Sequence, residues 1–102
     1  MAGGVKVSVV GELRRREVTV LHALQYLSEG EGKVAVSQRD LATALGWKQH
    51  TGIRHTTVSL ERHGLIRVTN NSTPGRLLPN TFEVTALGRF VAEVERSREV
   101  AA

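Results

Sequence analysis

The sequence predicts one small α+β domain, mostly α-helical, in which several helices are combined with a single antiparallel β-hairpin. Its 102 residues are enough for one domain with one hydrophobic core. Apolar residues recur at helical spacing before residue 64 and again after residue 86, whereas the stretch between them alternates with the period of a strand. Glycine and proline separate these segments, as is typical of turns between elements.

The first helix is predicted over residues 12–29, where apolar side chains recur at steps of three, four and seven. These side chains are Leu13, Val20, Leu21, Leu24 and Leu27. Gly30 and Gly32 end this helix, since glycine commonly follows the last apolar turn. The segment 34–36 is long enough only for a short strand.

A second helix begins at Ser37, whose hydroxyl can cap the first turn while Asp40 reaches back to the serine. It ends at Gly46, and its inward residues are Leu41, Ala42, Ala44 and Leu45. A third helix covers about residues 51–63 and ends at Gly64. The middle of the chain therefore holds two helices joined by a turn.

The hairpin follows the third helix. Residues 65–69 and 81–85 are rich in β-branched side chains, and the polar stretch 70–80 between them forms the tip. Thr85 caps a last helix over 86–99, whose apolar stripe is Leu87, Phe90, Val91 and Val94. Residues 12–99 thus form the domain, with an N-terminal arm or edge strand at 1–11 and a tail at 100–102.

Composition excludes several classes of protein. With no cysteine, the chain forms no disulfide and no thiolate zinc site, and the spacing of His50, His55 and His63 does not suit a shared metal. No Gly-rich phosphate loop or nucleophile elbow occurs, so we expect no enzyme activity, no cofactor and no small-molecule substrate. The apolar run at 5–10 is far shorter than the ~20 residues that cross a bilayer. We therefore expect a cytoplasmic protein with no membrane partner.

The positive charge is concentrated in one part of the chain. The protein has 14 Lys and Arg against 10 Asp and Glu, a net charge of +4. Between Lys48 and Arg89 there are six cations and two anions, which accounts for the whole excess. This distribution indicates a surface that binds a polyanion, and the alternative is a solvated surface that happens to be basic.

Three motifs resemble those of winged helix-turn-helix regulators. Leu41-Ala42-Thr43-Ala44-Leu45-Gly46 is similar to the first helix and turn glycine of many bacterial and archaeal regulators. Leu60-Glu61-Arg62-His63-Gly64-Leu65-Ile66 resembles their LExxGLI junction with the wing, and Val84-Thr85-Ala86-Leu87-Gly88-Arg89 resembles the hLTxxG start of the post-wing helix in MarR-like and PadR-like proteins. ArsR-like and TrmB-like proteins share the motifs. The resemblance implies a winged helix-turn-helix fold and DNA binding in transcription regulation.

The turn before the third helix departs from this pattern. Gly46 to Ile53 spans one residue more than the common turn, which predicts a longer turn or a different helix start. Gly52 lies in the first helical turn, where glycine costs about 1 kcal/mol relative to alanine and often marks the close approach of a backbone or a ligand.

A helical wheel separates the two faces of the third helix. Ile53, Thr57 and Leu60, with Thr56 on the flank, are predicted to face the core. The predicted base-reading residues on the other face are Thr51, Arg54, His55, Val58 and Ser59. Arg54 can donate two hydrogen bonds to guanine, and Val58 can contact a thymine methyl group. The alternative is a solvated amphipathic helix.

Contacts with the DNA backbone and the minor groove are expected around this helix. The predicted phosphate or turn contacts are Ser37, Gln38, Lys48, Gln49, His50 and Arg62. The predicted wing contacts are Asn71, Ser72, Thr73 and Arg76. Arg76 resembles the wing arginine that enters the narrow minor groove of A·T-rich DNA. The alternative is a disordered loop with one charge.

A homodimer is expected because specific regulators usually bind two half-sites about one helical turn apart. The predicted interface residues are Val7, Val9, Phe90, Val91 and Val94. Trp47 is interpreted as a core residue beneath the turn, and His22 as a surface or interface residue.

Three functions fit the sequence. The first is a sequence-specific, double-stranded DNA-binding transcriptional regulator, a dimeric repressor that acts by occlusion. The alternatives are a plasmid or viral replication or partition protein and a winged helix used only for protein contacts. A protein-contact module should tolerate the loss of Arg54 and Arg76, whereas a DNA reader should not.

Overall fold

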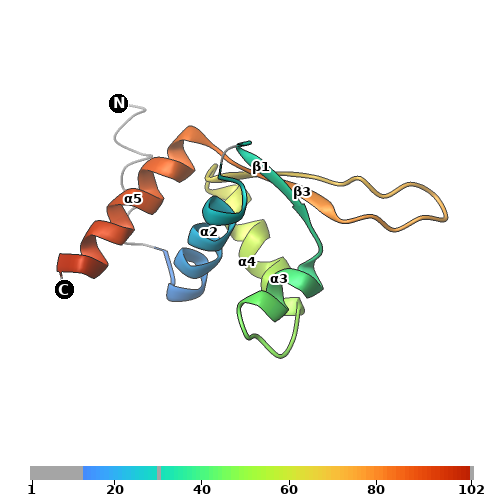
Figure 1. Ribbon diagram of the computed structural model, residues 1–102, viewed down its shortest axis with the longest axis horizontal. Helices are drawn as coiled ribbons and strands as arrows, with labels where there is room; N and C mark the ends of the chain where they lie inside the picture. The colour runs from blue at the N-terminus through green and yellow to red at the C-terminus, as the bar shows by residue number, and fades with distance from the viewer. Residues whose placement is uncertain (1–12, 30, 102) are drawn as a thin grey trace.

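The computed structural model describes residues 13–29 and 31–101, with side chains described as far as residue 98. The predicted order of helix, strand, helix, helix, strand, strand and helix is confirmed (Figure 1). The elements are α2 (Arg15–Leu27), β1 (Lys33–Val36), α3 (Gln38–Ala44), α4 (Thr51–Arg62), β2 (Ile66–Thr69), β3 (Asn80–Val84) and α5 (Ala86–Ala101). The arm predicted at 1–11 lies outside the described residues.

Within the described residues, the sheet has three antiparallel strands in the order β1-β3-β2. The predicted hairpin of β2 and β3 is confirmed, with a register from Ile66↔Val84 to Thr69↔Thr81. β1 pairs with the other side of β3, from Lys33↔Glu83 to Val36↔Asn80. The short strand thus has a partner that the sequence did not assign. A third strand supports the hairpin, because an isolated two-stranded hairpin is marginally stable in water.

One hydrophobic core lies between the helices and the sheet. It contains residues from every described element except β1, whose Val34 and Val36 pack against it half-buried. The largest fully buried side chains are those of Val20, Leu21, Leu24, Leu41, Ile53, Leu60, Leu65, Ile66, Phe82 and Val91. α2 packs against both α4 and α5. The loop joining β2 and β3 extends away from this body, on the side opposite to α5 (Figure 1).

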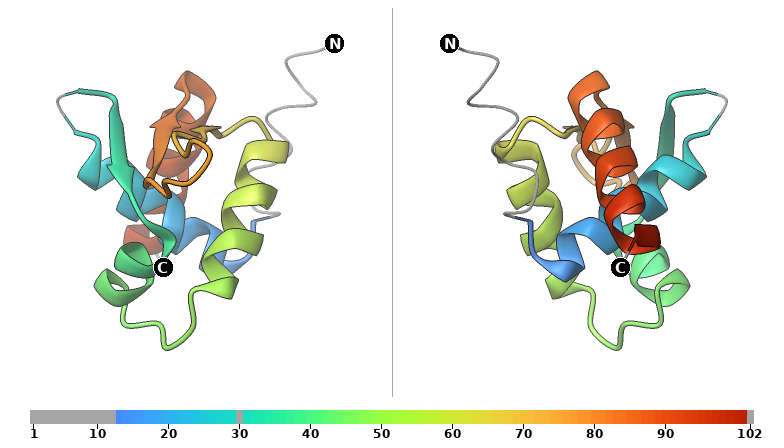
Figure 2. Two further views of the ribbon diagram at one scale, coloured as in Figure 1. Left: turned by 90° about the vertical axis from the view of Figure 1, so that its right-hand side faces the viewer. Right: turned by 90° about the vertical axis from the view of Figure 1, so that its left-hand side faces the viewer.

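The predicted helix ends are confirmed at three positions. The Asp40 N–H donates to Ser37 Oγ at 2.9 Å, so Ser37 caps α3. Gly46 and Gly64 follow the ends of α3 and α4 with φ of +75° and +79°, a conformation that glycine adopts without strain. Figure 2 shows residues 45–50 at the bottom of the molecule, where they join the lower ends of α3 and α4.

Three apolar residues do not lie where they are predicted on the buried faces of the first two helices. Ala44 is exposed, because it lies off the stripe formed by Leu41, Ala42 and Leu45 on the two turns of α3. Leu27 is 42% exposed, because it is the last residue of α2, at the edge of the stripe. Leu13 precedes α2 and packs against the core from outside the helix. Within the described residues, none of the helices combines the length and apolar character that a membrane crossing requires.

Candidate nucleic-acid interface

The orientation predicted for α4 is confirmed. Ile53, Thr56, Thr57 and Leu60 are buried, so this face of the helix belongs to the core. Four predicted base-reading residues are exposed on the other side, namely Thr51, Arg54, His55 and Val58. Val58 is 45% exposed although it is a large apolar residue. A row of arginine, histidine, threonine and valine therefore faces solvent along one helix.

Ser59 lies on the flank of α4 that faces α2. It is half-buried, and its hydroxyl donates to Glu17 Oε2. The other oxygen of Glu17 accepts the Arg14 N–H at 2.7 Å. Glu17 is itself only 8% exposed, so both oxygens of a buried carboxylate are satisfied. The Ser59 hydroxyl thus joins α4 to α2. Sequence reasoning missed Glu17, although a glutamate at the third position of a helix is a known capping signal.

Trp47, in the turn between α3 and α4, is predicted to pack in the core beneath this turn. Trp47 is half-buried against the core, and its N–H donates to the Ala42 carbonyl at 2.8 Å. The guanidinium carbon of Arg16 lies 4.6 Å from the centre of the Trp47 ring. A Cβ added at Gly52 would lie 3.0 Å from Arg16 Nη1. The close approach expected at Gly52 is therefore made by the Arg16 side chain.

The predicted phosphate contacts fall into two groups. Lys48, Gln49, His50 and Arg62 are exposed, the first three in the turn and Arg62 at the last position of α4. His50 is the N-cap residue of α4 and makes no side-chain cap hydrogen bond. Ser37 and Gln38 are half-buried, and the Ser37 hydroxyl is engaged in capping α3.

The hairpin tip is an ordered turn. The Thr73 N–H donates to the Arg76 carbonyl at 3.0 Å, and the Arg76 N–H donates to the Thr73 carbonyl at 2.9 Å. Pro74 and Gly75 occupy the turn between them, with a φ of +80° at Gly75. This is the arrangement for which a proline-glycine pair is suited. The Thr73 and Arg76 side chains are exposed at the tip.

Asn71 and Ser72 hold the two sides of this hairpin together. Asn71 Nδ2 donates to the Pro79 carbonyl at 2.9 Å and to Thr81 Oγ1 at 2.8 Å. Ser72 Oγ accepts the Leu78 N–H at 2.9 Å. Both residues are half-buried, so their polar groups serve the hairpin. Leu77, which sequence reasoning did not single out, is 93% exposed next to Arg76.

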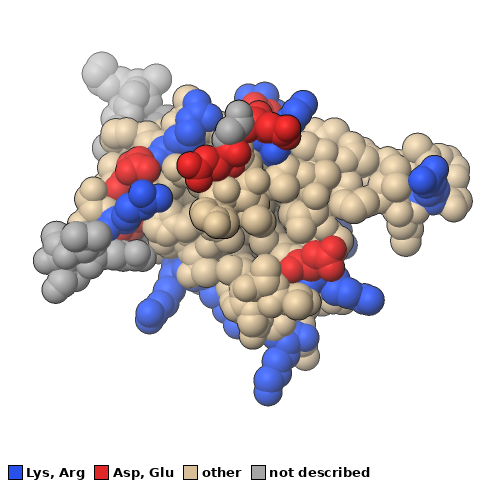
Figure 3. Space-filling view, viewed as in Figure 1, with Lys and Arg blue, Asp and Glu red and all other residues tan. Residues whose placement is uncertain are grey.

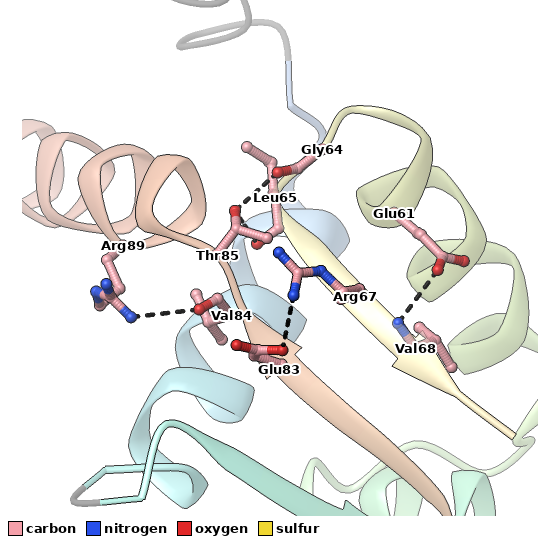
Figure 4. Close-up of polar contacts among 9 residues, drawn as sticks. All are labelled: Glu61, Gly64, Leu65, Arg67, Val68, Glu83, Val84, Thr85 and Arg89. Atoms are coloured by element: carbon pink, nitrogen blue, oxygen red, sulfur yellow. Dashed lines mark hydrogen bonds and ion pairs between the residues drawn. The ribbon is translucent and has the colours of Figure 1, made fainter. Parts of the chain in front are cut away.

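The base of the hairpin is fixed to α4 and α5 (Figure 4). A Glu61 carboxylate oxygen accepts the Val68 N–H at 3.1 Å, which joins α4 to β2. The Thr85 hydroxyl donates to the Gly64 carbonyl at 2.7 Å and accepts the Gly88 N–H at 3.0 Å, as predicted for the cap of α5. These contacts set the position of the hairpin relative to the exposed face of α4.

Charge is unevenly distributed on the surface. In Figure 3, acidic and basic side chains are mixed over the upper part of the face shown. The side chains that project from the lower edge, below α2 and the α3–α4 turn, and at the end of the hairpin are Lys and Arg, and acidic atoms lie beside the rightmost projection of the lower edge. The lower edge and the hairpin tip thus present positive charge.

No family model and no curated protein sequence matches the chain, but solved structures do. A MarR-family transcriptional regulator from Rhodococcus sp. RHA1 aligns with a TM-score of 0.69 and 24% identity, over 98% of this chain and 70% of that one. The chain has a winged-helix fold. The S. aureus MepR–DNA complex aligns with a TM-score of 0.65 and 18% identity, over 98% of this chain and 70% of the other. CouR from Rhodococcus jostii RHA1, bound to p-coumaroyl-CoA, aligns with a TM-score of 0.64 and 24% identity, over 98% of this chain and 68% of the other. The hairpin of β2, β3 and residues 70–79 is accordingly called the wing.

Two predictions about interfaces need correction. Val91 is fully buried in the core of its own chain and has no surface to offer a second copy. His22 is half-buried, and its Nε2 lies 3.0 Å from the Ala92 carbonyl, so it joins α2 to α5 within the chain. Phe90 is 50% exposed and Val94 is half-buried on α5. Val7 and Val9 lie outside the described residues.

Proposed function

We propose that this chain is a sequence-specific, double-stranded DNA-binding transcriptional regulator that places α4 in the major groove. The observation that carries the proposal is the exposed row of Thr51, Arg54, His55 and Val58, held beside an anchored wing. An α-helix with its side chains is about 10–12 Å wide and fits a major groove of about 12 Å. MepR, which shares the fold, has been solved in complex with DNA.

The residue types on α4 suit base edges. The planar fork of Arg54 donates two parallel hydrogen bonds to guanine, and the exposed Val58 offers an apolar contact to a thymine methyl group. Thr51 and His55 supply further donors and acceptors. Lys48, Gln49 and His50 before the helix and Arg62 at its end contact phosphates, which position the helix without reading sequence.

The wing extends the contact to the minor groove. Arg76 and Thr73 lie at its tip, where the turn is formed by backbone hydrogen bonds and leaves both side chains exposed. A narrow A·T-rich minor groove has an enhanced negative potential that attracts an inserted arginine. Asn71 and Ser72 keep the wing rigid enough to deliver it.

We further propose that the protein acts as a homodimeric repressor. One domain of this size contacts too little DNA for high specificity. Two copies that bind half-sites one helical turn apart double the contact. The exposed Phe90 and the half-buried Val94 on α5 are the described residues that we assign to the interface. The regulator acts in the cytoplasm as a binding protein without enzyme activity, and it represses by occluding the promoter.

Selection of bound duplexes from a random pool tests the proposal even though the target sequence is unknown. The selected duplex and a shuffled control are then titrated by fluorescence anisotropy at several salt concentrations. We expect a preference of about 10³-fold or more and a steep decrease in affinity with salt. A selected pool without a common sequence, or no binding at low salt, would contradict the proposal. The second result would favour a protein-contact module.

A further inference from the structure

We propose that Arg16, which lies on α2 and is stacked on Trp47, binds the DNA phosphates that run beside α4. This inference rests on the proposed function and adds a second element to the interface. The sequence alone points to no DNA contact from α2, because the charges outside residues 48–89 sum to zero. The structure brings the start of α2 to the flank of α4 that lies opposite the wing.

Two adjoining hollows line this flank of α4. Their volumes are about 490 and 560 Å³, and Arg16, Gly52 and His55 line both of them. The first also contains Arg14 and His63, and the second contains Trp47 and Lys48. Together the hollows form a shallow groove, which begins at the α3–α4 turn and follows α4 on its α2 side.

Arg16 is held in position over this groove. Its guanidinium carbon lies over the Trp47 ring, 4.6 Å from the ring centre, and Gly52 leaves room for its Nη1, since a Cβ there would lie only 3.0 Å away. Stacking uses the face of the guanidinium plane, whereas its N–H donors point outward within that plane. The donors of a stacked arginine are therefore available for the oxygens of a phosphate.

The groove is built for an anion. Three cationic side chains line it, from Arg14, Arg16 and Lys48. The carboxylate among its lining residues is that of Glu17, whose oxygens already accept the Arg14 N–H and the Ser59 hydroxyl. The opposite flank of α4 differs, since Glu61 lies there and accepts a hydrogen bond from β2.

The dimensions of DNA identify the anion. A helix that fills the major groove has one phosphate backbone along each of its flanks, because the groove is hardly wider than the helix. With α4 docked, one backbone passes between α4 and the wing. The other passes along the α2 flank, where Arg16 lies.

The test compares Arg16→Gln with Lys33→Gln, which removes the same charge from an exposed position at the start of β1. Both variants and the wild type are titrated with the selected and the shuffled duplex from 50 to 200 mM salt. The salt slope is the steepness with which the logarithm of the binding constant falls with the logarithm of the salt concentration. Each lost phosphate contact lowers this slope by about 0.9, which corresponds to a loss of about 8-fold in affinity at 0.1 M salt. Arg16→Gln should show this loss on both duplexes, and Lys33→Gln should stay within about twofold of the wild type.

The Trp47→Leu variant tests how Arg16 is held. Leucine keeps an apolar side chain beneath the turn but offers no ring face for Arg16. Part of the contribution of Arg16 to DNA affinity should therefore be lost. Adding Arg16→Gln to Trp47→Leu should then cost less than it does in the wild type. Circular dichroism melting shows whether each variant is folded. If Arg16→Gln is not folded, Arg16→Lys, which retains the charge, is measured in its place. The salt slope of Arg16→Lys should stay within about 0.3 of the wild-type slope.

Separate results overturn the two proposals. If the wild type prefers the selected duplex and Arg16→Gln binds both duplexes like Lys33→Gln, the Arg16 contact is wrong and the proposed function stands. The contact is also wrong if Arg16→Gln weakens only the selected duplex and leaves the salt slope unchanged, since that result indicates a base contact. If the wild type itself has no preference, the proposed function fails.

Discussion

Glu17 shows how one buried side chain fixes the position of the candidate reading helix. One of its oxygens accepts a hydrogen bond from the Arg14 N–H at the start of α2, and the other accepts one from the Ser59 hydroxyl on α4. A carboxylate that is 8% exposed is costly to bury unless it is hydrogen-bonded, so these partners are part of its stability. The same contact turns the Ser59 hydroxyl towards α2 and leaves Arg54, His55 and Val58 as the exposed row.

Replacement of Glu17 by alanine should lower the free energy of unfolding. The variant leaves the Ser59 hydroxyl and the Arg14 N–H without their acceptor, and each loss of this kind costs about 1–3 kcal/mol. Urea denaturation measures the change, with the exposed Glu29→Ala as the control. Equal stability of the two variants would show that the buried carboxylate does not hold α2 against α4.

Gly52→Ala should separate stability from DNA binding. Alanine favours a helical turn over glycine by up to about 1 kcal/mol, so the thermal midpoint should stay level or rise. The new Cβ would lie 3.0 Å from Arg16 Nη1, so the guanidinium must shift by a few tenths of an ångström on Trp47. Affinity for DNA should fall severalfold at the same time. A variant with unchanged affinity would contradict the role given to the Arg16 position.

The residues of the site differ in how far the sequence predicts them. The exposed face of α4 follows from the 3.6-residue period, because Ile53 and Leu60 fix which side is buried. The stacking of Arg16 on Trp47 could not be predicted, since it joins side chains of two helical segments far apart in the chain. The same is true of Glu17 and Ser59.

α5 packs very closely against Leu65, just before β2, and against the end of β3. A Cβ on Gly88 would lie 2.0 Å from the Leu65 carbonyl oxygen and 2.8 Å from Val84 Cγ1. Gly88 is buried in the first turn of α5, and its N–H donates to Thr85. This explains in physical terms the glycine of the Val84–Arg89 motif, where α5 packs directly on the backbone that enters β2.

Gly88→Ala should therefore destabilise the fold strongly. The backbone of residue 65 must move to admit the methyl group, and overpacking of this kind typically costs about 1–3 kcal/mol or more. Ser97→Ala, at an exposed position of α5, serves as the control and should change stability by less than about 0.5 kcal/mol. Chemical denaturation measures both. A Gly88→Ala variant as stable as the control would show that α5 does not pack as described.

The wing tip should contribute to binding but not to stability. The tip turn is closed by the backbone groups of Thr73 and Arg76, so Arg76→Ala removes no contact of the fold. We expect an unchanged thermal midpoint and a loss of about 5- to 30-fold in affinity for a duplex with an A·T-rich flank, about 1–2 kcal/mol. The loss should be smaller for a G·C-rich flank. Equal losses on both flanks would favour a plain phosphate contact.

The elements themselves were largely predictable from periodicity and from glycine and proline positions. The pairing of β1 with β3 was not, because it joins Val34 to Phe82 and no local pattern encodes such a contact. The exposure of Ala44 and Leu27 shows the related limit at helix ends, since Ala44 lies off the short stripe of α3 and Leu27 lies at the edge of the stripe of α2.

The fold places α4 between two flanks that are formed by different elements. The wing lies on one side, fixed by Glu61 and Thr85, and the start of α2 lies on the other, where it presents Arg16. The core behind α4 keeps these parts in a constant relation. Positive charge along the lower edge and at the wing tip follows from that arrangement (Figure 3).

The most direct test of the account is the binding of Arg54→Ala to the selected duplex and to a set of its single-base-pair variants. Fluorescence anisotropy gives the affinity of the wild type and of Arg54→Ala for each duplex. We predict that Arg54→Ala binds the selected duplex more weakly by about 1–3 kcal/mol and loses discrimination at one base pair, while discrimination elsewhere is retained. If Arg54→Ala binds the selected duplex as tightly as the wild type, with unchanged discrimination at every position, α4 does not read DNA as proposed.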